Sequence, residues 1–370
     1  MGAIECLTII LAGGNGTRLG ALTNHNAKPL VHFGGQYRII DFTLSNCTHS
    51  GIFPLGILTQ YQASEFQKYI GSGSNWTPDK GCGVHILPSR AGSPYTGTSN
   101  AVYQNLKFIE QYQPEHVLIL PSDHIYKMNY KEMLDFHKKT DADVTISVTS
   151  VPPENASRFG IVNITDTVKI TSFTEKPKKP KSSIASMGIY IFKWNQLKKH
   201  LIEDENNINS KHDFGKNIIP DFLNSGKKLY AFPFNGYWQD VGTIQSFWKA
   251  NMDLLSNSFD LYSNEDKWEI FTKPDSSPSH FVLNEANIKN SIISTSSDIH
   301  GKVKNSVVCD RVTISPGAEI SDCVIMPDAF IGDNVKIHKA VIGTGSWIIK
   351  EVVNDVDYRF SSKPGEALLI

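Results

Sequence analysis

A glycine-rich turn near the start of the chain constrains its folding more than any other stretch. The apolar run 6–11, rich in residues that favour strands, is typical of a buried strand. The loop Gly-Gly-Asn-Gly-Thr-Arg follows at 13–18, and its glycines remove side chains where the backbone turns and a large ligand can approach. Backbone N–H groups in such a loop can bind an anion, and Arg18 and Lys28 add positive charge. Taken alone, such a turn is more often structural than phosphate-binding.

The loop matches neither of the two common phosphate-binding motifs. A P-loop requires Gly-Lys-Ser/Thr after its last glycine, but Gly16 is followed by Thr-Arg. A dinucleotide-binding fold requires the spacing G-x-G-x-x-G, which this chain lacks.

The composition argues against several kinds of partner. With 36 Lys and Arg against 37 Asp and Glu, bulk charge does not favour binding to nucleic acid or to a membrane. We find no apolar run that approaches the length of a membrane span, and the N-terminus lacks the features of a signal peptide. The five cysteines are scattered and include no C-x-x-C pair, which argues against a disulfide framework or a zinc site and favours the reducing cytoplasm.

Short apolar strands alternate with helices through residues 1–255. Strands are expected at 6–11, 55–59, 83–88, 117–120 and 144–148, and helices from Ile39 and over 101–112, 130–139 and 243–255. This alternation predicts an α/β fold with a mainly parallel sheet covered on both faces. Because ligands bind beyond the carboxyl ends of such strands, the glycine loop and the residues after Leu120 should face one crevice.

The C-terminal part follows a different period. Apolar residues recur at intervals near six in two registers, Ile314-Ile320-Met326 and Ile325-Ile331-Ile337, the second continued by Ile342 and Ile348 after a one-residue slip. A period of six predicts a left-handed parallel β-helix, with short antiparallel strands as the alternative. We therefore expect an α/β domain at 1–255, a linker at 256–281 and a β-helix domain at 282–370.

Two carboxylates are candidate metal ligands. Asp123 follows the strand that ends at Leu120, and Asp240 lies in the stretch 236–243. Mg²⁺ usually takes one or two protein carboxylates and completes its shell with phosphates and water. The alternative for each residue is a cap on the following turn or helix, which is the simpler interpretation of either one alone.

A series of motifs in order along nearly the whole chain resembles a known family. They are Gly-Gly-x-Gly-Thr-Arg-Leu, Lys-Pro, Gly-Gly-x-Tyr-Arg-Ile-Ile-Asp-Phe-x-Leu-Ser-Asn, Leu-Thr-Gln-Tyr, Asp-His-Ile-Tyr-Lys-Met, Arg-Phe-Gly-Ile, Glu-Lys-Pro, Ser-Met-Gly-Ile-Tyr, His-Asp-Phe-Gly-Lys and Trp-x-Asp-Val-Gly-Thr. The chain is similar to the sugar-nucleotide pyrophosphorylases and, among them, to the glucose-1-phosphate adenylyltransferase (ADP-glucose pyrophosphorylase) family of bacterial glycogen synthesis. The resemblance implies a Rossmann-like nucleotidyltransferase domain, a C-terminal β-helix and a tetramer, either a homotetramer or one that includes a related regulatory subunit.

The resemblance also implies a reaction and a set of site residues. AMP would pass from ATP to α-D-glucose 1-phosphate, with Mg²⁺ as cofactor. The implied roles are nucleotide binding by Gly13, Gly14, Gly16 and Gly97, catalysis by Arg18, Lys28 and Asp123, Mg²⁺ binding by Asp123 and Asp240, and glucose 1-phosphate binding by Tyr95, Gly160, Glu175, Lys176 and Ser186. For Lys176, which would hold the sugar phosphate, the alternative is a solvated charge run with the lysines that follow it.

This chemistry agrees with the absence of a serine or cysteine nucleophile system from the motifs. The attacking group would be a phosphate oxygen with a second pKa of about 6, so it is mostly ionised at pH 7 without a general base. Alignment with the α-phosphorus and neutralisation of the leaving pyrophosphate would suffice. We therefore interpret His124 as structural.

Several positions depart from the usual pattern of the family. Ser122 stands where a glycine usually precedes the metal aspartate, and Asn100 replaces a common aspartate. Asn15, His25 and Asn26 occupy positions that are basic in members activated by sugar bisphosphates, so we expect weak or absent activation by fructose 1,6-bisphosphate. Alternatives to the main interpretation are a non-catalytic regulatory subunit, a pyrophosphorylase for another base, and acyl transfer by the β-helix.

Overall fold

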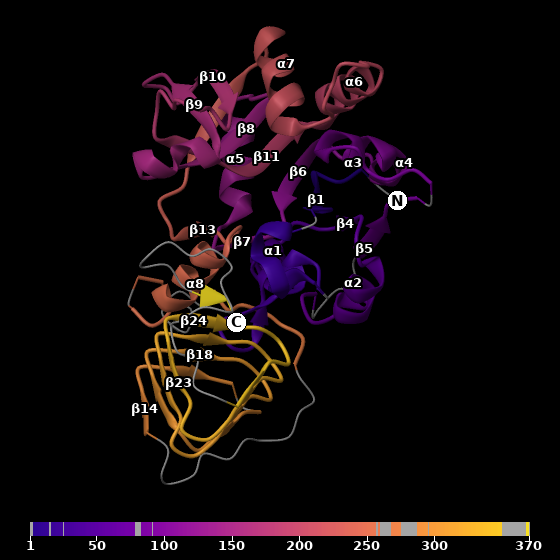
Figure 1. The fold of residues 1–370 in the computed structure, drawn as a ribbon. Helices are drawn as coiled ribbons and strands as arrows, with labels where there is room; N and C mark the ends of the chain where they lie inside the picture. Colours follow the sequence, from indigo (N-terminus) through magenta and orange to yellow (C-terminus); the bar gives the residue numbers. More distant parts are fainter. Residues whose placement is uncertain are drawn as a thin grey trace. The chain divides into compact units, whose positions relative to one another are not determined.

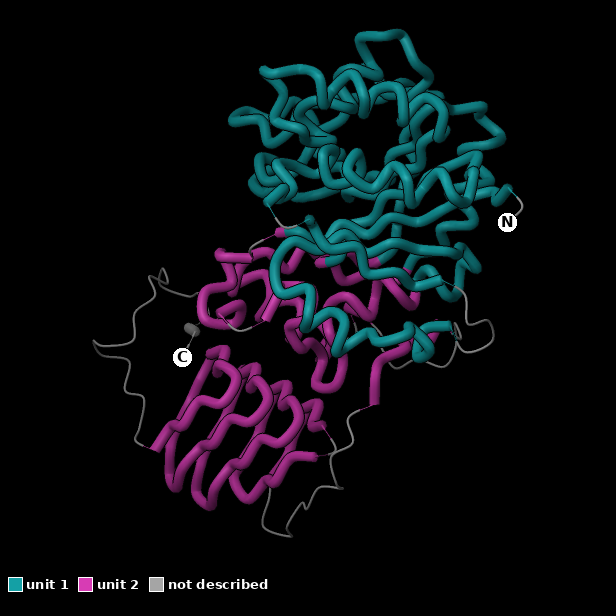
Figure 2. The backbone as a smooth tube through the Cα atoms, turned by 90° about the vertical axis from the view of Figure 1, so that its right-hand side faces the viewer, with its two compact units in different colours: residues 1–13, 46–122, 128–236 teal, residues 14–45, 123–127, 237–370 magenta. Residues whose placement is uncertain are grey.

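The computed structural model describes residues 3–14, 16–24, 26–77, 83–90, 92–256, 258–259, 268–274, 287–294, 296–349 and 368–369 (Figure 1). The chain divides into two compact units that interleave along the sequence (Figure 2). Unit 1 consists of residues 1–13, 46–122 and 128–236, and unit 2 of residues 14–45, 123–127 and 237–370. Among the described residues, no helix has both the length and the apolar character that a membrane span requires.

Unit 1 is built on a nine-stranded sheet. Seven strands form the path β10-β9-β11-β6-β1-β4-β5, while β8 pairs with β11 and β12 pairs with β8. The strands are β1 Cys6–Ala12, β4 Leu55–Thr59, β5 Val84–Pro88, β6 His116–Pro121, β8 Val144–Ser150, β9 Gly160–Ile164, β10 Ile170–Glu175, β11 Ile184–Lys193 and β12 Leu229–Pro233.

The part of this sheet that carries the glycine loop is parallel. Strands β5, β4, β1 and β6 all run in the same direction, and β12 runs parallel to β8. Strand β11 joins the two groups by running antiparallel to both β6 and β8. Since β1 and β4 have neighbours on both sides and carry apolar side chains on both faces, they are almost entirely buried. The expected α/β nucleotidyltransferase architecture is confirmed.

Short α-helices connect the strands of unit 1. They are α2 Ala63–Ile70, α3 Thr98–Gln104, α4 Leu106–Tyr112, α5 Tyr130–Lys139, α6 Trp194–Glu205 and α7 Ile219–Asn224, with a π-helical turn at Phe214–Ile218 and a 3-10 turn at Pro153–Arg158. Helix α5 matches its expected bounds, because Asn129 caps its first turn by accepting from Lys131 N and basic residues fill its last turn.

The single helix expected over 101–112 is wrong, because α3 and α4 are separate helices. Asn105 leaves helical geometry between them, with φ −108° and ψ 17°. Its side-chain amide donates to Tyr95 Oη at 3.0 Å and to Ala101 O at 2.8 Å. These tertiary and local bonds stabilise a break that the apolar spacing alone does not reveal.

Unit 2 begins with short elements and ends with a β-helix. The former are 3-10 turns at Thr17–Thr23 and Lys28–Leu30, a hairpin of β2 His32–Phe33 and β3 Tyr37–Arg38, the first part of α1 Ile39–Ser50, the strand pair β7 His124–Tyr126 and β13 Trp238–Asp240, and α8 Ile244–Asp253. Phe33 and Phe42 pack with Phe247 of α8, and the same apolar core reaches Val324 and Met326 of the β-helix. Trp248 of α8 donates its indole N–H to Asp322 O at 2.7 Å.

The β-helix consists of three parallel sheets whose strands repeat coil after coil (Figure 1). One sheet has β14 Asn287–Lys289, β17 Lys302–Lys304, β20 Glu319–Ser321 and β23 Lys336–His338; the second has β15 Ile292–Ile293, β18 Val307–Val308, β21 Val324–Ile325, β24 Ala340–Ile342 and β26 Leu368–Leu369; the third has β16 Asp298–Ile299, β19 Thr313–Ile314, β22 Phe330–Ile331 and β25 Trp347–Ile348. The expected left-handed parallel β-helix is confirmed.

The register expected for one apolar series is wrong. Ile314 and Ile320 point into the β-helix core, but the next strand residue in that core is Ile325, while Met326 packs into the core shared with α8. The physical reason is the length of the coil. Lys302 pairs with Glu319 on the next coil, 17 residues further along the chain. Three sides of six residues each would need one residue more, so one side of the coil is shorter by one residue. The slip after Ile337 arises in the same way.

Candidate active site

A lysine ammonium lies between two carboxylates in unit 2. Lys28 opens the 3-10 turn Lys28–Leu30 and is only 5% exposed. Its Nζ lies 2.6 Å from Asp123 Oδ2 and 3.4 Å from Asp240 Oδ1. Three residues that are far apart in the sequence therefore meet at one point.

The strand pair β7–β13 brings the two carboxylates together. These strands run antiparallel with His124 opposite Asp240, and Asp123 directly precedes β7. Trp238 strengthens the pairing by donating its indole N–H to His124 Nδ1 at 3.2 Å. His124 thus has a structural contact at the site, in keeping with its interpretation from the sequence.

The capping alternatives for both aspartates are wrong. Asp123 leads into a strand rather than a helix, and its carboxylate bonds to Lys28. Helix α8 is capped by Thr243, whose hydroxyl accepts from Ser246 N while the Ser246 hydroxyl accepts from Thr243 N. Neither carboxylate therefore caps the start of a helix.

Gly242 keeps space open beside Asp240 and Arg18. A Cβ placed on Gly242 would lie 2.9 and 3.2 Å from the two carboxylate oxygens of Asp240 and 3.1 Å from Arg18 Nη2. The guanidinium of Arg18 therefore faces the same small space as the carboxylate of Asp240. Lys28, which contacts the same Asp240 carboxylate, adds a second cation, and Asp123 adds a second carboxylate to this group.

This charge arrangement keeps Asp123 ionised. Burial by itself would raise the pKa of Asp123, but the ammonium of Lys28, with His124 and Arg18 nearby, lowers the pKa to about 2. About a third of the Asp123 side chain remains exposed. The site therefore presents a permanent carboxylate that a ligand can reach.

The two carboxylates fit a magnesium ion. Their oxygens approach one common point, now held by the Lys28 ammonium, and both are hard ligands of the kind that Mg²⁺ prefers. Mg²⁺ needs few protein ligands where phosphates and water supply the remainder. Within the described ranges, no cluster of three or more metal-binding side chains is found.

The glycines of the N-terminal loop differ in what they make possible. Gly16 has φ +62°, and a Cβ on it would lie 2.9 Å from Lys28 Cβ, so a side chain there would displace the lysine. Among the described residues, a Cβ on Gly14 would meet no atom within 4 Å, and one on Gly13 would lie 3.7 and 3.9 Å from the Gln60 and Tyr95 side chains. Gly16 is thus required by the fold, whereas Gly14 borders open space. Asn15 and His25 lie outside the described residues, and the expected weak activation by fructose 1,6-bisphosphate stays a prediction.

Three of the residues expected to bind glucose 1-phosphate lie together in unit 1. Glu175 ends β10 opposite Gly160 of β9, and Lys176 Nζ lies 3.3 Å from Glu175 Oε1. A Cβ on Gly160 would lie 2.9 Å from Glu175 Oε2. Burial raises the pKa of Glu175, and the ammonium of Lys176 opposes that shift. Lys176 is largely exposed and adopts φ +45°, so it departs from the extended backbone expected before a proline.

Ser186, Tyr95 and Gly97 have separate surroundings. Ser186 lies on β11, where its hydroxyl accepts from Gly188 N at 3.1 Å and lies 3.5 Å from Tyr190 Oη. Tyr95 lies beside Gly13 and donates to Leu87 O at 3.1 Å. A Cβ on Gly97 would lie 2.1 Å from His212 O, so Gly97 allows two backbone segments to touch.

Known proteins share both the N-terminal and the C-terminal parts of this chain. Residues 7–257 match the family model described as nucleotidyl transferase, and residues 277–360 match that of the GlmU-like C-terminal hexapeptide. The glucose-1-phosphate adenylyltransferase of Bacillus cytotoxicus is 51% identical over 346 residues, which are 92% of this chain and 92% of that protein. The enzymes of the same name from Acetivibrio thermocellus and Bacillus cereus are 49% and 50% identical over 92% of this chain and over 81% and 92% of their own length. The chain belongs to the glucose-1-phosphate adenylyltransferase family.

Ser122, where the family resemblance leads us to expect glycine, has a defined place in the structure. Its hydroxyl donates to Leu11 O at 2.7 Å, and the residue is 2% exposed. The bond joins the end of β6 to the neighbouring end of β1. The Ser122 side chain is thus buried beside the sheet, and its hydroxyl points to the main chain of β1.

Sequence reasoning missed two glycines that border the expected substrate groups. Gly242 adjoins Asp240, and a Cβ on Gly215 would lie 2.5 Å from Glu175 Oε2. Both glycines lie in motifs that carry the family resemblance, Asp-Val-Gly-Thr and Asp-Phe-Gly-Lys. A glycine at a fixed place in such a motif is the signal of a close approach that a side chain would block.

Proposed function

We propose that this chain transfers AMP from ATP to α-D-glucose 1-phosphate and produces ADP-glucose and pyrophosphate. The observation that carries the proposal is the meeting of Lys28 with Asp123 and Asp240, beside Arg18. Two cations and two carboxylates around a small space suit the handling of phosphates with a divalent ion. Relatives that are about half identical over most of their length carry the name of this reaction.

The residues of the chain act by binding and orientation. An ionised phosphate oxygen of glucose 1-phosphate attacks the α-phosphorus of ATP, and the bond from that phosphorus to the bridging oxygen of the β-phosphate breaks. Arg18 and Lys28 offset the negative charge that pyrophosphate carries away. Glu175 accepts hydrogen bonds from sugar hydroxyls, and Lys176 binds the sugar phosphate as a point charge.

We infer that Asp123 and Asp240 hold Mg²⁺. Such an ion, when bound, supplies Lewis acidity and charge neutralisation at the phosphates. The low pKa of Asp123 keeps its carboxylate ionised and able to bind a cation throughout the physiological range.

The proposal extends to the cellular setting that the family resemblance implies. The reaction would serve glycogen biosynthesis in the cytoplasm, with a catalytic part at 1–255, a linker at 256–281 and a C-terminal part at 282–370 that mediates assembly and allosteric control. The assembly would be a homotetramer, or a heterotetramer with a related regulatory subunit. The balanced charge of the chain supports small-molecule substrates over nucleic acid or a membrane.

The test measures pyrophosphate release from glucose 1-phosphate with ATP, UTP, dTTP, CTP and GTP, each with and without Mg²⁺. We expect turnover with ATP that requires Mg²⁺ and is lost in Asp123→Ala, and no loss in the control Asp135→Ala, which removes an exposed carboxylate on α5. Undiminished turnover in Asp123→Ala would refute the metal assignment. Preference for another nucleotide would identify a different pyrophosphorylase, and no product from homogeneous protein would favour a regulatory subunit.

A further inference from the structure

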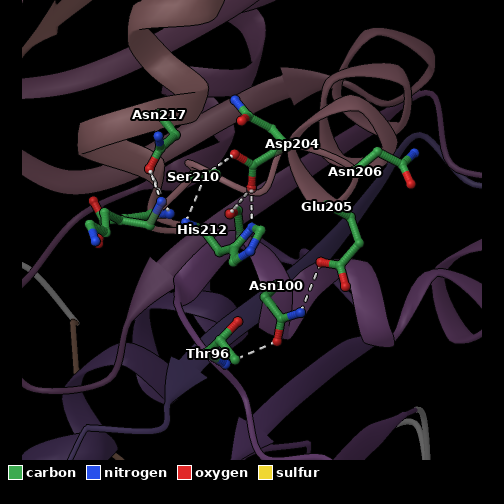
Figure 3. Close-up of polar contacts among 12 residues, drawn as sticks. Thr96, Asn100, Asp204, Glu205, Asn206, Ser210, His212 and Asn217 are labelled. Atoms are coloured by element: carbon green, nitrogen blue, oxygen red, sulfur yellow. Dashed lines mark hydrogen bonds and ion pairs between the residues drawn. The ribbon is translucent and has the colours of Figure 1, made fainter.

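A buried aspartate outside the residues discussed so far joins helix α3 to the segment 210–212 of unit 1 (Figure 3). Asp204 lies in the last turn of α6 and is 4% exposed. Its Oδ2 accepts from Ser99 Oγ at 2.7 Å and from His212 Nδ1 at 3.1 Å. Its Oδ1 accepts from Ser210 Oγ. Three donors thus compensate the burial of this charge.

The geometry of this cluster excludes a nucleophilic triad. In such a triad the serine hydroxyl donates to the imidazole, and the carboxylate bonds to the other imidazole nitrogen. Here the Ser99 hydroxyl donates to the carboxylate itself. Asp204 therefore serves to hold its three partners in place.

The partners of Asp204 belong to two backbone segments that touch. Ser99 N donates to His212 O at 2.9 Å, and Phe214 N donates to Thr98 Oγ1 at 3.0 Å. Asp204 bonds to both sides of this contact, through Ser99 on α3 and through His212. The Ser210 hydroxyl adds a link by accepting from His212 N at 2.9 Å while it donates to Asp204.

The segment held in this way continues to Glu175. Asp213 caps the following π-helical turn by accepting from Lys216 N at 3.0 Å. Phe214 stacks on Tyr190 with ring centroids 5.9 Å apart. The next residue, Gly215, lies so close to Glu175 that an added Cβ would be 2.5 Å from Oε2. The position of residues 211–216 therefore decides how much room Glu175 has.

We propose that Asp204 is a positioning residue for the glucose 1-phosphate end of the site. The inference rests on the proposed function, because that function assigns Glu175 to the sugar. Asp204 fixes residues 211–216 against α3, and the fixed segment keeps Gly215 against Glu175. Without the Asp204 charge the segment loosens, Glu175 gains alternative rotamers, and glucose 1-phosphate binds more weakly than ATP does.

The test is Asp204→Asn, which keeps the side-chain shape but removes the charge and one acceptor. We expect the KM for glucose 1-phosphate to rise about tenfold and the KM for ATP to change less than about twofold. Amide hydrogen exchange of residues 211–216 should become faster. The matched control is Glu203→Gln, which makes the same charge change at an exposed neighbour on α6 and should leave both KM values and the exchange rates unchanged.

A second variant covers the case in which Asp204→Asn does not fold. Ser210→Ala removes one of the three donors and should shift the same KM in the same direction by about threefold. The role of Asp204 would be overturned if the KM for glucose 1-phosphate stayed unchanged in both variants. It would also be overturned if the KM for glucose 1-phosphate and the KM for ATP rose equally. In either case, an active wild-type protein would leave the proposed function intact. A wild type with no activity towards glucose 1-phosphate would instead overturn the proposed function and, with it, the substrate assigned here.

Discussion

Asn100 donates its side-chain amide to Glu205 Oε2 at 2.9 Å (Figure 3). Its amide oxygen accepts from Thr96 N and from Gln104 Nε2, both at 3.0 Å. Only a side chain with both a donor and an acceptor satisfies all three partners, and an aspartate carboxylate has no donor at neutral pH. Asn100, where the family resemblance leads us to expect aspartate, is therefore matched to Glu205.

Asn100→Asp should destabilise unit 1, because two carboxylates would face each other where Asn100 is 4% exposed. We expect a loss of about 1–3 kcal/mol in the free energy of unfolding at pH 7. Glu205→Gln in the same chain should restore most of that loss by supplying a donor. Urea unfolding of the two single variants and the double variant gives the coupling energy, and additive effects would refute the match.

Lys28→Met should lower kcat/KM about a hundredfold or more, because an apolar side chain leaves two carboxylates close together and removes a phosphate-binding cation. Lys28→Arg should retain part of the activity. Lys131→Met on α5 is the control, since among the described residues its ammonium contacts the exposed carboxylates of Glu5 and Asp135. Pyrophosphate release measures all three, and a Lys28→Met enzyme within threefold of the control would contradict the assigned role.

Gly16→Ala and Gly14→Ala should fail in different ways. The first forces a side chain into φ +62° and against Lys28, so it should lower the stability by about 1–2 kcal/mol and reduce turnover with it. The second adds a methyl group to open space, so the melting temperature should stay the same while the KM for ATP rises if this loop surrounds the nucleotide. Thermal melts and ATP titrations separate the two effects; a Gly14→Ala protein that melts early would contradict the open space.

Acid should destabilise the fold through a buried histidine. Burial, with a contribution from neighbouring His116, lowers the pKa of His137 from 6.5 to about 3. Between these two pKa values the His137 imidazole is protonated in the unfolded chain but neutral in the folded chain. The free energy of unfolding therefore falls by about 1.4 kcal/mol for each unit by which the pH is lowered in this range. His137→Gln should flatten this dependence, whereas exposed His338→Gln should not. Urea unfolding from pH 7 to pH 4 tests it, and equal slopes in both variants would refute it.

The parts of the fold that repeat locally were predictable from the sequence. Strand β4 and helix α5 have the expected bounds because each buries an uninterrupted pattern between clear breaks. The break at Asn105 was not predictable, since it depends on a bond to Tyr95. That Ile325, and not Met326, points into the β-helix core was also not predictable, because it depends on the length of a complete β-helix coil.

The site was predictable only through the family resemblance. Asp123 and Asp240 lie close together because β7 pairs with β13. No local sequence pattern predicts the pairing of two such short strands. Asp204 gave no signal at all, since a carboxylate at the end of an amphipathic helix is usually solvated. Its burial arises from Ser99 and His212, which only the tertiary structure brings to it.

The apolar core of unit 2 has a consequence for how this protein can evolve. Phe33 and Phe247 share that core with Val324 and Met326 of the C-terminal coils. A volume change on one side must be met on the other, because close-packed interiors do not absorb it. We therefore expect that, across relatives, residues of the coils covary with residues of the stretches that carry Phe33 and Phe247. Hybrids that combine the coils of one relative with the remainder of another should need compensating substitutions in this shared core.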